Sequence, residues 1–354
     1  MLGDKKMNTQ KVAAAAQAPQ SAPPEAVLMQ MVAGCFVSQA VSVAAKLGLA
    51  DLVADKPQRV ATLAARTQTH ERSLYRLLRT LASVGVFVET DPQVFGLTPL
   101  AEPLRTGVPG SLRDIAIFMG EEWHWRVYGN MPYSVQTGKP AWSYTHGAEV
   151  FDYFAQNPAH GEVFNRAMTS YSQHVVPAIL EAYDFNGIKK LVDIAGGHGL
   201  LLSSVLKANS GVKGVLFDLP HVVEGARPLL EKEGVADRVE IMSGDFFSEV
   251  PAGADAYMMK FIIHDWDDER ALKILHNIRR AIAENGRLLI VETVIPEGNE
   301  PHFGKIMDME MLVSPGGIER TAEDFRELLG QAGFKLNRVV QTNSPLSIVE
   351  AVRA

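Results

Sequence analysis

Cysteine is almost absent from this sequence of 354 residues, and Cys35 is the single example. One thiol cannot form an intrachain disulfide, and it cannot supply the several sulfur ligands of a structural zinc site. The sequence therefore excludes a small scaffold held by disulfides, and it predicts no metal cofactor. Such cysteine usage is typical of a reducing compartment, so we expect a cytoplasmic protein.

Positive charge is also scarce, because 34 lysines and arginines face 41 aspartates and glutamates, which gives a net charge of −7. A chain with this balance lacks the positive field that holds proteins on nucleic acid or on anionic lipid. We find no apolar run of membrane-spanning length, and residues 1–24 are too polar and proline-rich for a secretory signal. We therefore expect a disordered tail over residues 1–24 and neither nucleic acid nor membrane as a partner.

Helical patterns dominate residues 25–182 and predict a first domain. Its early part resembles a winged-helix unit, with helices over 57–66 and 71–84 followed by a hairpin over 86–97. A DNA-binding regulator is one interpretation, but acidic residues in and around the hairpin offset the arginines of the second helix. The segment 27–49 is too apolar to face water alone, so we expect it to pair with a second copy of the chain in a homodimer.

From residue 188 onward, short β-runs alternate with helical patterns, which predicts a second domain over residues 183–354. The predicted strands span residues 191–194, 215–218, 239–242, 256–263, 287–293, 336–340 and 347–352. Alternation of this kind is typical of a doubly wound α/β sheet, in which ligands bind at the carboxyl ends of the strands.

Three successive strand ends carry residues suited to a nucleotide-like cofactor. The first strand runs into a glycine-rich turn over 195–199, where missing side chains let a ligand touch backbone. Asp218 ends the second strand and can accept both hydroxyl protons of a ribose. Asp245 and Phe246 follow the third strand and offer a carboxylate and a ring to an adenine. An NAD(P)-dependent oxidoreductase is an alternative, which is weakened because Leu202 replaces the third glycine of the dinucleotide fingerprint.

His264 follows the fourth strand, beside the same crevice. An imidazole there can take a proton from an acceptor hydroxyl, because its ordinary pKa lies near neutral pH. Glu292 and Glu319 are acids that could hold the ring, although either could instead pair with Arg320 or Lys305. The sequence therefore predicts a general base with carboxylate support.

Five segments together resemble the caffeate, acetylserotonin and hydroxyneurosporene type of small-molecule O-methyltransferases, which depend on S-adenosylmethionine. They span residues 192–199, 217–220, 244–247, 260–266 and 315–321. The resemblance covers roughly residues 25–354 and keeps the family's order and similar spacing. It implies an α/β fold, in which a Rossmann-like class I methyltransferase domain with an antiparallel last strand follows a helical, winged-helix-like dimerisation domain.

The resemblance also implies roles for individual residues, with His264 as the base and Glu292 and Glu319 orienting it. The implied cofactor contacts are Gly196, Asp218, Leu219, Gly244, Asp245, Phe246, Lys260 and Trp266. We assign acceptor binding to aromatic, soft or polar side chains suited to a flat ring, namely Trp123, Met131, Phe164, Met168, Asp308 and Met311. Two residues depart from the family pattern, because Ala195 replaces a glycine and Glu310 brings a charge into a segment expected to line the acceptor pocket.

The implied reaction is methyl transfer from S-adenosylmethionine to a hydroxyl, which leaves S-adenosylhomocysteine and belongs to secondary metabolism. We expect a small aromatic or polyketide-like acceptor with a phenolic hydroxyl, since a positioned imidazole can remove a phenol's proton. A carboxylate beside the ring raises the pKa of the imidazole, so we expect activity to fall below about pH 6 to 7.

Overall fold

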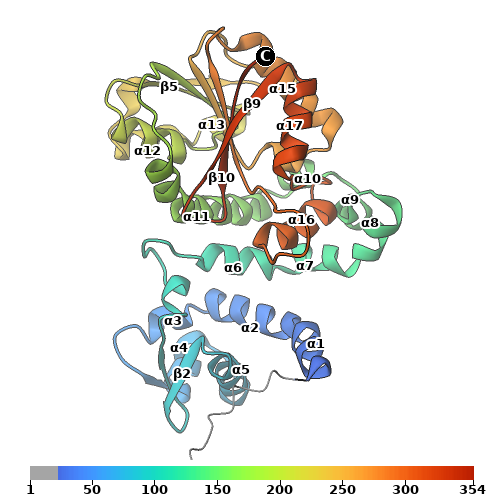
Figure 1. The fold of residues 1–354 in the computed structure, drawn as a ribbon. Coiled ribbons are helices and arrows are strands. Elements are labelled where there is room, and N and C mark those ends of the chain that lie inside the picture. The colour runs from blue at the N-terminus through green and yellow to red at the C-terminus, as the bar shows by residue number, and fades with distance from the viewer. Residues whose placement is uncertain (1–22) are drawn as a thin grey trace, which may run out of the picture.

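The computed structural model describes residues 23–354 (Figure 1). The predicted tail over residues 1–24 lies almost entirely outside this range. In Figure 1 the helical N-terminal part lies below and the sheet domain lies above, with helix α11 (Pro158–Ala182) running between them. This long helix packs against α6 (Arg113–Met119) on one side and against α12 (Leu200–Ala208) on the other. It therefore joins the two parts of the chain.

The C-terminal part is built on one seven-stranded sheet with the order β6-β5-β4-β7-β8-β10-β9. The strands are β4 (Lys190–Ile194), β5 (Lys213–Asp218), β6 (Val239–Ser243), β7 (Ala256–Lys260), β8 (Arg287–Glu292), β9 (Phe334–Gln341) and β10 (Ser347–Arg353). The first five run parallel, and β10 pairs antiparallel with both β8 and β9. The predicted Rossmann-like sheet with its antiparallel strand is confirmed.

Helices cover both faces of this sheet, as its apolar strands require. One face packs against α11, α12 and α14 (Arg227–Lys232), and the other packs against α15 (Asp268–Ala281) and α17 (Ala322–Gln331). Side chains cap the N-termini of α15 and α17. Asp267 accepts the N–H of Arg270 at the start of α15, and Thr321 forms a capping box with Asp324 at the start of α17. Short helices α13 (Pro220–Val223) and η2 (Ala236–Arg238) complete the connections near the β6 edge.

The N-terminal part is a small helical domain with a three-stranded sheet of order β1-β3-β2. Its elements are α1 (Pro24–Val32), α2 (Gly34–Lys46), α3 (Leu49–Leu52), β1 (Gln58–Arg59), α4 (Val60–Thr67), α5 (Glu71–Ser83), β2 (Phe87–Asp91), β3 (Val94–Leu97) and η1 (Glu102–Leu104). Buried leucines of α4 and α5 and two phenylalanines of the hairpin form its core. The predicted winged-helix-like pattern is confirmed, except that β1 occupies the start of the predicted helix over 57–66.

Most side chains of α1 and several on α2 are apolar and exposed. The predicted continuous helix over 27–49 is broken at Ala33, between α1 and α2. Met29, Met31, Val32 and Phe36 expose 65% or more of their area, so no other part of residues 23–354 covers this surface.

The segment Pro24–Lys46 is long and apolar enough to cross a membrane, at a mean hydropathy of 1.7. The sequence-based expectation that no apolar segment reaches this length was therefore wrong. Length and composition alone are weak evidence for a membrane span, because a helix that packs on protein passes the same test.

Six helices over residues 113–182 enclose a cluster of aromatic side chains between the two parts. After α6 come α7 (Glu122–Gly129), α8 (Met131–Thr137), α9 (Ala141–His146), α10 (Val150–Gln156) and then α11. Buried members of the cluster include Phe118, Trp123, Trp142 and Phe154, and Val313 of α16 (Phe303–Val313) packs on it. We call this group the aromatic cluster.

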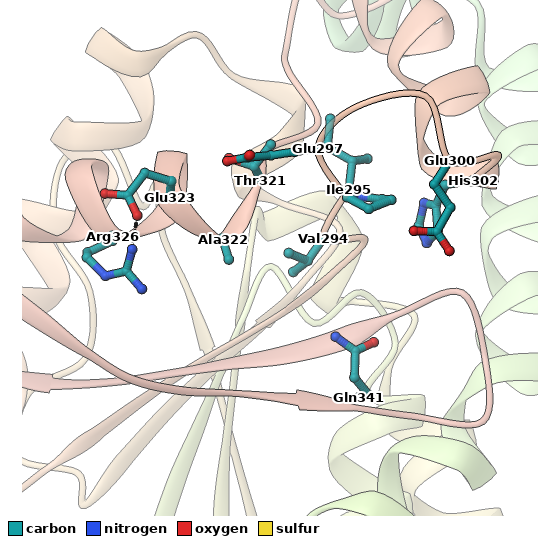
Figure 2. Close-up of a pocket in the computed structure, with 11 residues that line it drawn as sticks. Val294, Ile295, Glu297, Glu300, His302, Thr321, Ala322, Glu323, Arg326 and Gln341 are labelled. Carbon is teal, nitrogen blue, oxygen red and sulfur yellow. Dashed lines mark hydrogen bonds and ion pairs between the residues drawn. The ribbon is translucent and has the colours of Figure 1, made fainter.

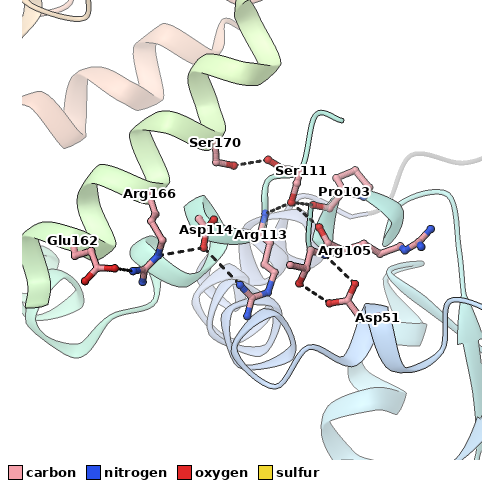
Figure 3. A network of polar contacts seen from close by, with 10 residues as sticks. Asp51, Pro103, Arg105, Ser111, Arg113, Asp114, Glu162, Arg166 and Ser170 are labelled. Carbon is pink, nitrogen blue, oxygen red and sulfur yellow. Dashed lines mark hydrogen bonds and ion pairs between the residues drawn. The ribbon is translucent and has the colours of Figure 1, made fainter. Parts of the chain in front are cut away.

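A chain of polar contacts ties the N-terminal domain to α11 (Figure 3). The Ser170 hydroxyl of α11 donates to the carbonyl of Ser111 at 2.5 Å, and the Ser111 hydroxyl donates to the carbonyl of Arg105 at 2.7 Å. Asp51 of α3 accepts both the backbone N–H and the hydroxyl of Thr106. These contacts fix the loop between η1 and α6, so the N-terminal domain has a defined position against the rest of the chain.

Candidate active site

The residues predicted to bind a cofactor come together at the carboxyl ends of four adjacent strands. Because β6, β5, β4 and β7 are neighbours in the sheet, the turns that follow them meet along one edge. Gly196 follows β4, Asp218 and Leu219 lie at the end of β5, and Gly244, Asp245 and Phe246 follow β6, while Lys260 ends β7. The sequence analysis predicted these residues at the ends of separate strands, and the order of the strands in the sheet brings them to one edge.

The turn between β4 and α12 is narrow and tightly wound. Gly197 and Gly199 have positive φ angles of 61° and 85°, and Ala195 also has a positive φ of 52°. A Cβ on Gly196 would lie 2.6 Å from a carboxylate oxygen of Asp193 and 2.6 Å from Leu216. Any side chain at position 196 would therefore clash with Asp193 and Leu216. Ala195 adopts a left-handed backbone conformation, which is unfavourable for an L-residue.

Asp218 holds this turn from the next strand. Its two carboxylate oxygens accept the backbone N–H groups of Gly197 at 2.8 Å and Leu219 at 2.7 Å. Each oxygen keeps a further acceptor site, so the carboxylate can still receive the hydroxyls of a diol. Burial raises the pKa of Asp218, and the two amide donors oppose that rise.

Beside it, Asp245 caps the turn after β6, and aromatic rings flank this turn. Asp245 accepts the N–H of Phe247 at 2.8 Å and the hydroxyl of Ser248 at 3.2 Å. The ring of Trp266 lies 6.1 Å from that of Phe246 and 4.8 Å from that of Phe247, between centroids. These rings meet edge to face and form an apolar group beside the turn after β6.

Asp193 and Lys260 are opposite charges near the carboxyl ends of the neighbouring strands β4 and β7. Burial raises the pKa of Asp193 to about 7, and the nearby Lys260 opposes that rise. Burial lowers the pKa of Lys260 to about 8, and Asp193 is the first of the acids that oppose that fall. One oxygen of Asp193 has no hydrogen-bond partner. The sequence analysis predicted Lys260 but not Asp193, whose signal was a charge inside an apolar strand.

His264 does not end a strand, in contrast to the prediction of a strand over 256–263. Strand β7 stops at Lys260, Phe261 turns the chain with a positive φ of 57°, and His264 lies on a short 3-10 turn, η3 (Ile263–Asp265). One carboxylate oxygen of Glu292 accepts the backbone N–H groups of Ile262, Ile263 and His264 at 2.7 to 3.2 Å. Glu292 therefore positions the backbone of the predicted base, not its ring as expected.

The imidazole of His264 is held by Glu319. Its Nδ1 lies 2.8 Å from a carboxylate oxygen of Glu319, whose own backbone N–H is accepted by Asp308 at 2.8 Å. The alternative pairings do not occur, because Arg320 pairs with Asp268 and Lys305 donates to two backbone carbonyls. Nδ1 is thus occupied, and Nε2 is the nitrogen left to meet an acceptor.

Acidic side chains surround the buried ring of His264. Burial lowers the pKa of the imidazole, but the nearby Asp265, Glu319 and Glu292 more than offset this effect and raise the pKa to about 9. Asp265 is a residue that the sequence analysis missed, and its carboxylate lies 3.5 Å from Nε2. The pKa lies above the sequence-based expectation, because the sequence did not reveal how many carboxylates face the ring.

The predicted acceptor residues lie in two places. Trp123 is buried inside the aromatic cluster, where it stacks on His160 at 4.8 Å, and Phe164, Met168 and Met131 pack against the cluster. Asp308 and Met311 belong to α16, and Met311 is buried. The arrangement brings aromatic and sulfur-containing side chains together, while the acceptor contact of each one stays a prediction.

A surface hollow elsewhere carries none of the predicted site residues (Figure 2). It lies between the segment after β8 and the start of α17, and its lining includes Ile295, His302 and an ion pair between Glu323 and Arg326. Within residues 23–354, no group of three histidine, cysteine or acidic side chains is placed to hold a metal ion.

Comparison with known proteins agrees with this geometry. The model of the O-methyltransferase domain matches residues 128–335, and the model of the O-methyltransferase dimerisation domain matches residues 29–107. The chain belongs to the S-adenosylmethionine-dependent O-methyltransferases. The oxidoreductase and DNA-binding interpretations are therefore set aside for this member of the family.

Relatives of this methyltransferase differ in the atom that they methylate. The chain is 48% identical to phenazine O-methyltransferase from Lysobacter antibioticus, over 93% of this chain and 96% of the relative. It is 37% identical to 8-amino-8-demethylriboflavin N,N-dimethyltransferase from Streptomyces davaonensis, over 89% and 90% of the two chains. A crystal structure of an O-methyltransferase from neocarzinostatin biosynthesis, in complex with S-adenosylmethionine and 2-hydroxy-5-methyl naphthoic acid, has a TM-score of 0.77 at 31% identity, covering 90% and 96%.

The strained turn after β4 yields a prediction about stability. We expect Ala195→Gly to stabilise the protein by roughly 0.5 to 1 kcal/mol. A left-handed conformation costs an L-residue about 1 to 2 kcal/mol, which glycine avoids. Glycine also raises the conformational entropy of the unfolded chain, and this offsets part of the gain in stability. Gly197→Ala is the matched control, since its Cβ would meet no atom within 4 Å and only the backbone cost remains. Urea unfolding curves should shift in opposite directions, and a loss of stability in both variants would contradict the argument.

Proposed function

We propose that this methyltransferase transfers the methyl group of S-adenosylmethionine to a hydroxyl, preferably phenolic, of a small flat aromatic molecule, with His264 as general base. The observation that carries the proposal is the contact between Glu319 and Nδ1 of His264, which leaves Nε2 as the proton-accepting nitrogen. The relatives support an aromatic acceptor, since one is named for phenazines and another binds a naphthoic acid.

The residues at the strand ends fit the cofactor. Gly196 lies in the turn that would face the methionine part, and Asp218 with Leu219 would hold the ribose edge. Gly244, Asp245, Phe246 and Trp266 would enclose the adenine, and Lys260 would lie beside the cofactor with Asp193 beneath it. When bound, S-adenosylmethionine supplies a methyl group on a sulfonium, which a deprotonated acceptor oxygen can attack.

The task of His264 is proton removal. A phenol has a pKa near 10, so few molecules are ionised at neutral pH, and a positioned base contributes on the order of 10²–10⁴-fold to the rate. An imidazole with a pKa of about 9 is well matched to that proton. Glu319 fixes the tautomer and stabilises the imidazolium that forms, and Glu292 holds the turn that carries the ring.

Methylation of oxygen is favoured over methylation of nitrogen by this arrangement. A neutral amine already has a lone pair for the methyl group, whereas a phenol gains most of its reactivity by losing a proton. The buried carboxylate–imidazole pair would be of little use to an amine acceptor. We assign acceptor contacts to Trp123, Met131, Phe164, Met168, Asp308 and Met311.

We also propose a cytoplasmic homodimer formed through the N-terminal domain. The exposed apolar side chains of α1 and α2 support this assembly, and the dimerisation-domain match covers most of the same segment. We take residues 25–182 as the dimerisation and acceptor-lining part and residues 183–354 as the catalytic part. We assign no surface of residues 23–354 to nucleic acid or to a membrane.

The central test is a screen of phenols for transfer of label from methyl-labelled S-adenosylmethionine, followed by His264→Gln. We expect this substitution to lower kcat by about 10²–10⁴-fold, the usual contribution of a general base. Affinity for the cofactor, measured by calorimetry, should stay within a few fold. His276→Gln, on an exposed face of α15, is the control and should leave both quantities unchanged.

Acceptor acidity separates a base from a positioning residue. A phenol that is already ionised at the assay pH should recover much of its rate in His264→Gln, because no proton has to be removed. An equal loss on every phenol, regardless of its pKa, would mean that His264 only positions the acceptor.

The pH profile gives a second prediction. Since a base must be unprotonated and the pKa of His264 is raised, kcat/KM should rise with pH through neutrality toward about 9. Glu319→Gln removes one of the carboxylates that raise this pKa, so the acidic limb should move to lower pH. A limb that stays in place in Glu319→Gln would show that another group titrates.

A single charged substitution in the exposed apolar surface of the N-terminal domain tests the proposed dimer. Phe36→Glu places a carboxylate in the centre of the exposed apolar surface of α2, where desolvation would oppose association, so we expect mostly monomer at micromolar concentration. Val135→Glu on α8 is the control, because Val135 is similarly exposed but lies outside the dimerisation match. Light scattering decides the question, and a dimer that persists in Phe36→Glu would place the interface elsewhere.

A further inference from the structure

Phe261, between β7 and the turn that carries His264, has an unfavourable backbone conformation. Its φ of 57° lies in the left-handed region, which L-residues with bulky side chains rarely adopt. Within residues 23–354 the other non-glycine residues with a positive φ are Gln68, Gln93 and Ala195, so Phe261 is the aromatic one among them. Glycine would adopt this conformation without strain, so an aromatic side chain at this position needs a physical reason.

Contacts with β8 hold the backbone of Phe261 in this conformation. Its N–H donates to the carbonyl of Val291 at 3.2 Å. The next three N–H groups of the chain, up to that of His264, are accepted by Glu292 at the end of the same strand. One strand therefore fixes both Phe261 and the turn after it, so the fold determines how the two rings of Phe261 and His264 lie relative to each other.

The Phe261 ring is stacked on the His264 imidazole. The two ring centroids are 5.1 Å apart, and the ring planes are inclined by 24°. Tyr171 of α11 also contacts Phe261, at 5.4 Å between centroids, and both rings pack on the core that α11 and α12 form with the sheet. Phe261 is thus anchored in the apolar core and contacts the predicted base.

Stacking restricts a motion that the contact with Glu319 leaves open. The contact between Nδ1 of His264 and Glu319 at 2.8 Å fixes one edge of the imidazole, but the plane of the ring can still tilt about that bond. Packing one face of the imidazole on Phe261 opposes this tilt. Nε2 then keeps a defined direction, as the transfer of a proton requires.

Stacking also affects the charge of the imidazole. The face of an aromatic ring is electrically negative, so it attracts a protonated imidazole more strongly than a neutral one. Phe261 therefore stabilises the imidazolium that forms when His264 takes a proton.

Several other charged or titratable groups lie around this stack. They are Asp265 on η3, Glu292 on β8, Glu319 before α17, Lys260 on β7 and Tyr171 on α11. The three carboxylates outweigh burial and raise the pKa of His264 to about 9. Nζ of Lys260 lies 4.5 Å from the centroid of the Phe261 ring and disfavours a second cation nearby, whereas burial raises the pKa of Tyr171 and keeps it neutral. All of these groups remain when Phe261 alone is replaced.

We propose that Phe261 is a positioning residue for the predicted base, because its ring fixes the plane of the His264 imidazole and stabilises the imidazolium. The inference rests on the proposed function, since the stack has this use only if His264 accepts a proton. It also gives a reason for an aromatic side chain at a position where glycine would be unstrained.

The first measurement is the pKa of His264 in the full-length protein, by NMR titration after labelling histidine with ¹³C at Cε1. His264→Gln assigns the signal, because it removes that signal from the spectrum. Phe261→Leu keeps an apolar side chain and a similar backbone cost but removes the ring. We expect the pKa of His264 to fall by roughly 0.4 to 0.7 in this variant, as the usual strength of a cation–aromatic contact requires. Phe261→Tyr keeps the ring and should keep the wild-type pKa.

The second measurement is methyl transfer to phenols of different acidity. Phe261→Leu should lower kcat by about tenfold or more on a phenol that is neutral at the assay pH, because a misdirected Nε2 removes its proton poorly. The loss should be smaller on a phenol that is already ionised. The acidic limb of the pH profile should move to lower pH together with the pKa of His264, which a general loss of structure would not cause.

Phe185→Leu is the matched control, because Phe185 belongs to the same core and its ring contacts Tyr183 at 4.9 Å but, within residues 23–354, no histidine ring. We expect this variant to lose stability while the pKa of His264 stays unchanged. Phe261→Met replaces Phe261→Leu if the leucine variant is unstable. An unchanged pKa of His264 in the variants that lack the ring, or an equal change in Phe185→Leu, would overturn the proposal. Absence of label transfer to every phenol would instead overturn the proposed function, while the pKa of His264 could still be compared by NMR.

Discussion

The candidate active site depends on one buried carboxylate that holds the backbone of the predicted base without touching its ring. Glu292 ends β8 and accepts three consecutive backbone N–H groups of the turn that follows β7. A strand that continued past Lys260 would have paired these groups with a neighbour, so the carboxylate stabilises the place where the strand stops. The backbone carbonyl of His264, on this turn, accepts the N–H of Ile318 at 2.8 Å. That hydrogen bond holds the loop that carries Glu319 against the turn.

Close packing of backbone makes this loop possible. A Cβ on Gly317 would lie 1.8 Å from the carbonyl oxygen of His264, so only glycine lets the two segments approach. Arg320 then anchors the loop by donating to the carbonyls of Ile263, Ile318 and Trp266 and by pairing with Asp268. The predicted base is therefore held through backbone and side-chain contacts from three separate parts of the chain, as a positioned proton acceptor would require.

Charged side chains gather at two places near the carboxyl edge of the sheet. Asp218 accepts two backbone amides beside β4, and Asp193 and Lys260 influence each other's pKa. Around η3, the carboxylates of Asp265, Glu292 and Glu319 surround the imidazole of His264. The family keeps a common fold for methyl transfer while its relatives act on different acceptors.

Local patterns in the sequence determined the family and all seven strands of the main sheet, because apolar periodicity acts within a few residues. They also picked out the glycine-rich turn, Asp218 and His264, since each lies at or near the carboxyl end of a strand. Only the tertiary structure decided that Glu292 binds the backbone of the turn and that Glu319 binds the ring, because residues 28 and 55 positions apart in sequence meet there. The partners of Glu310 were equally hidden, since His124 lies 186 residues away on a different helix. A sequence shows which side chains can ionise. The fold decides which of them are buried next to one another, and burial and neighbouring charges then set the pKa of each group.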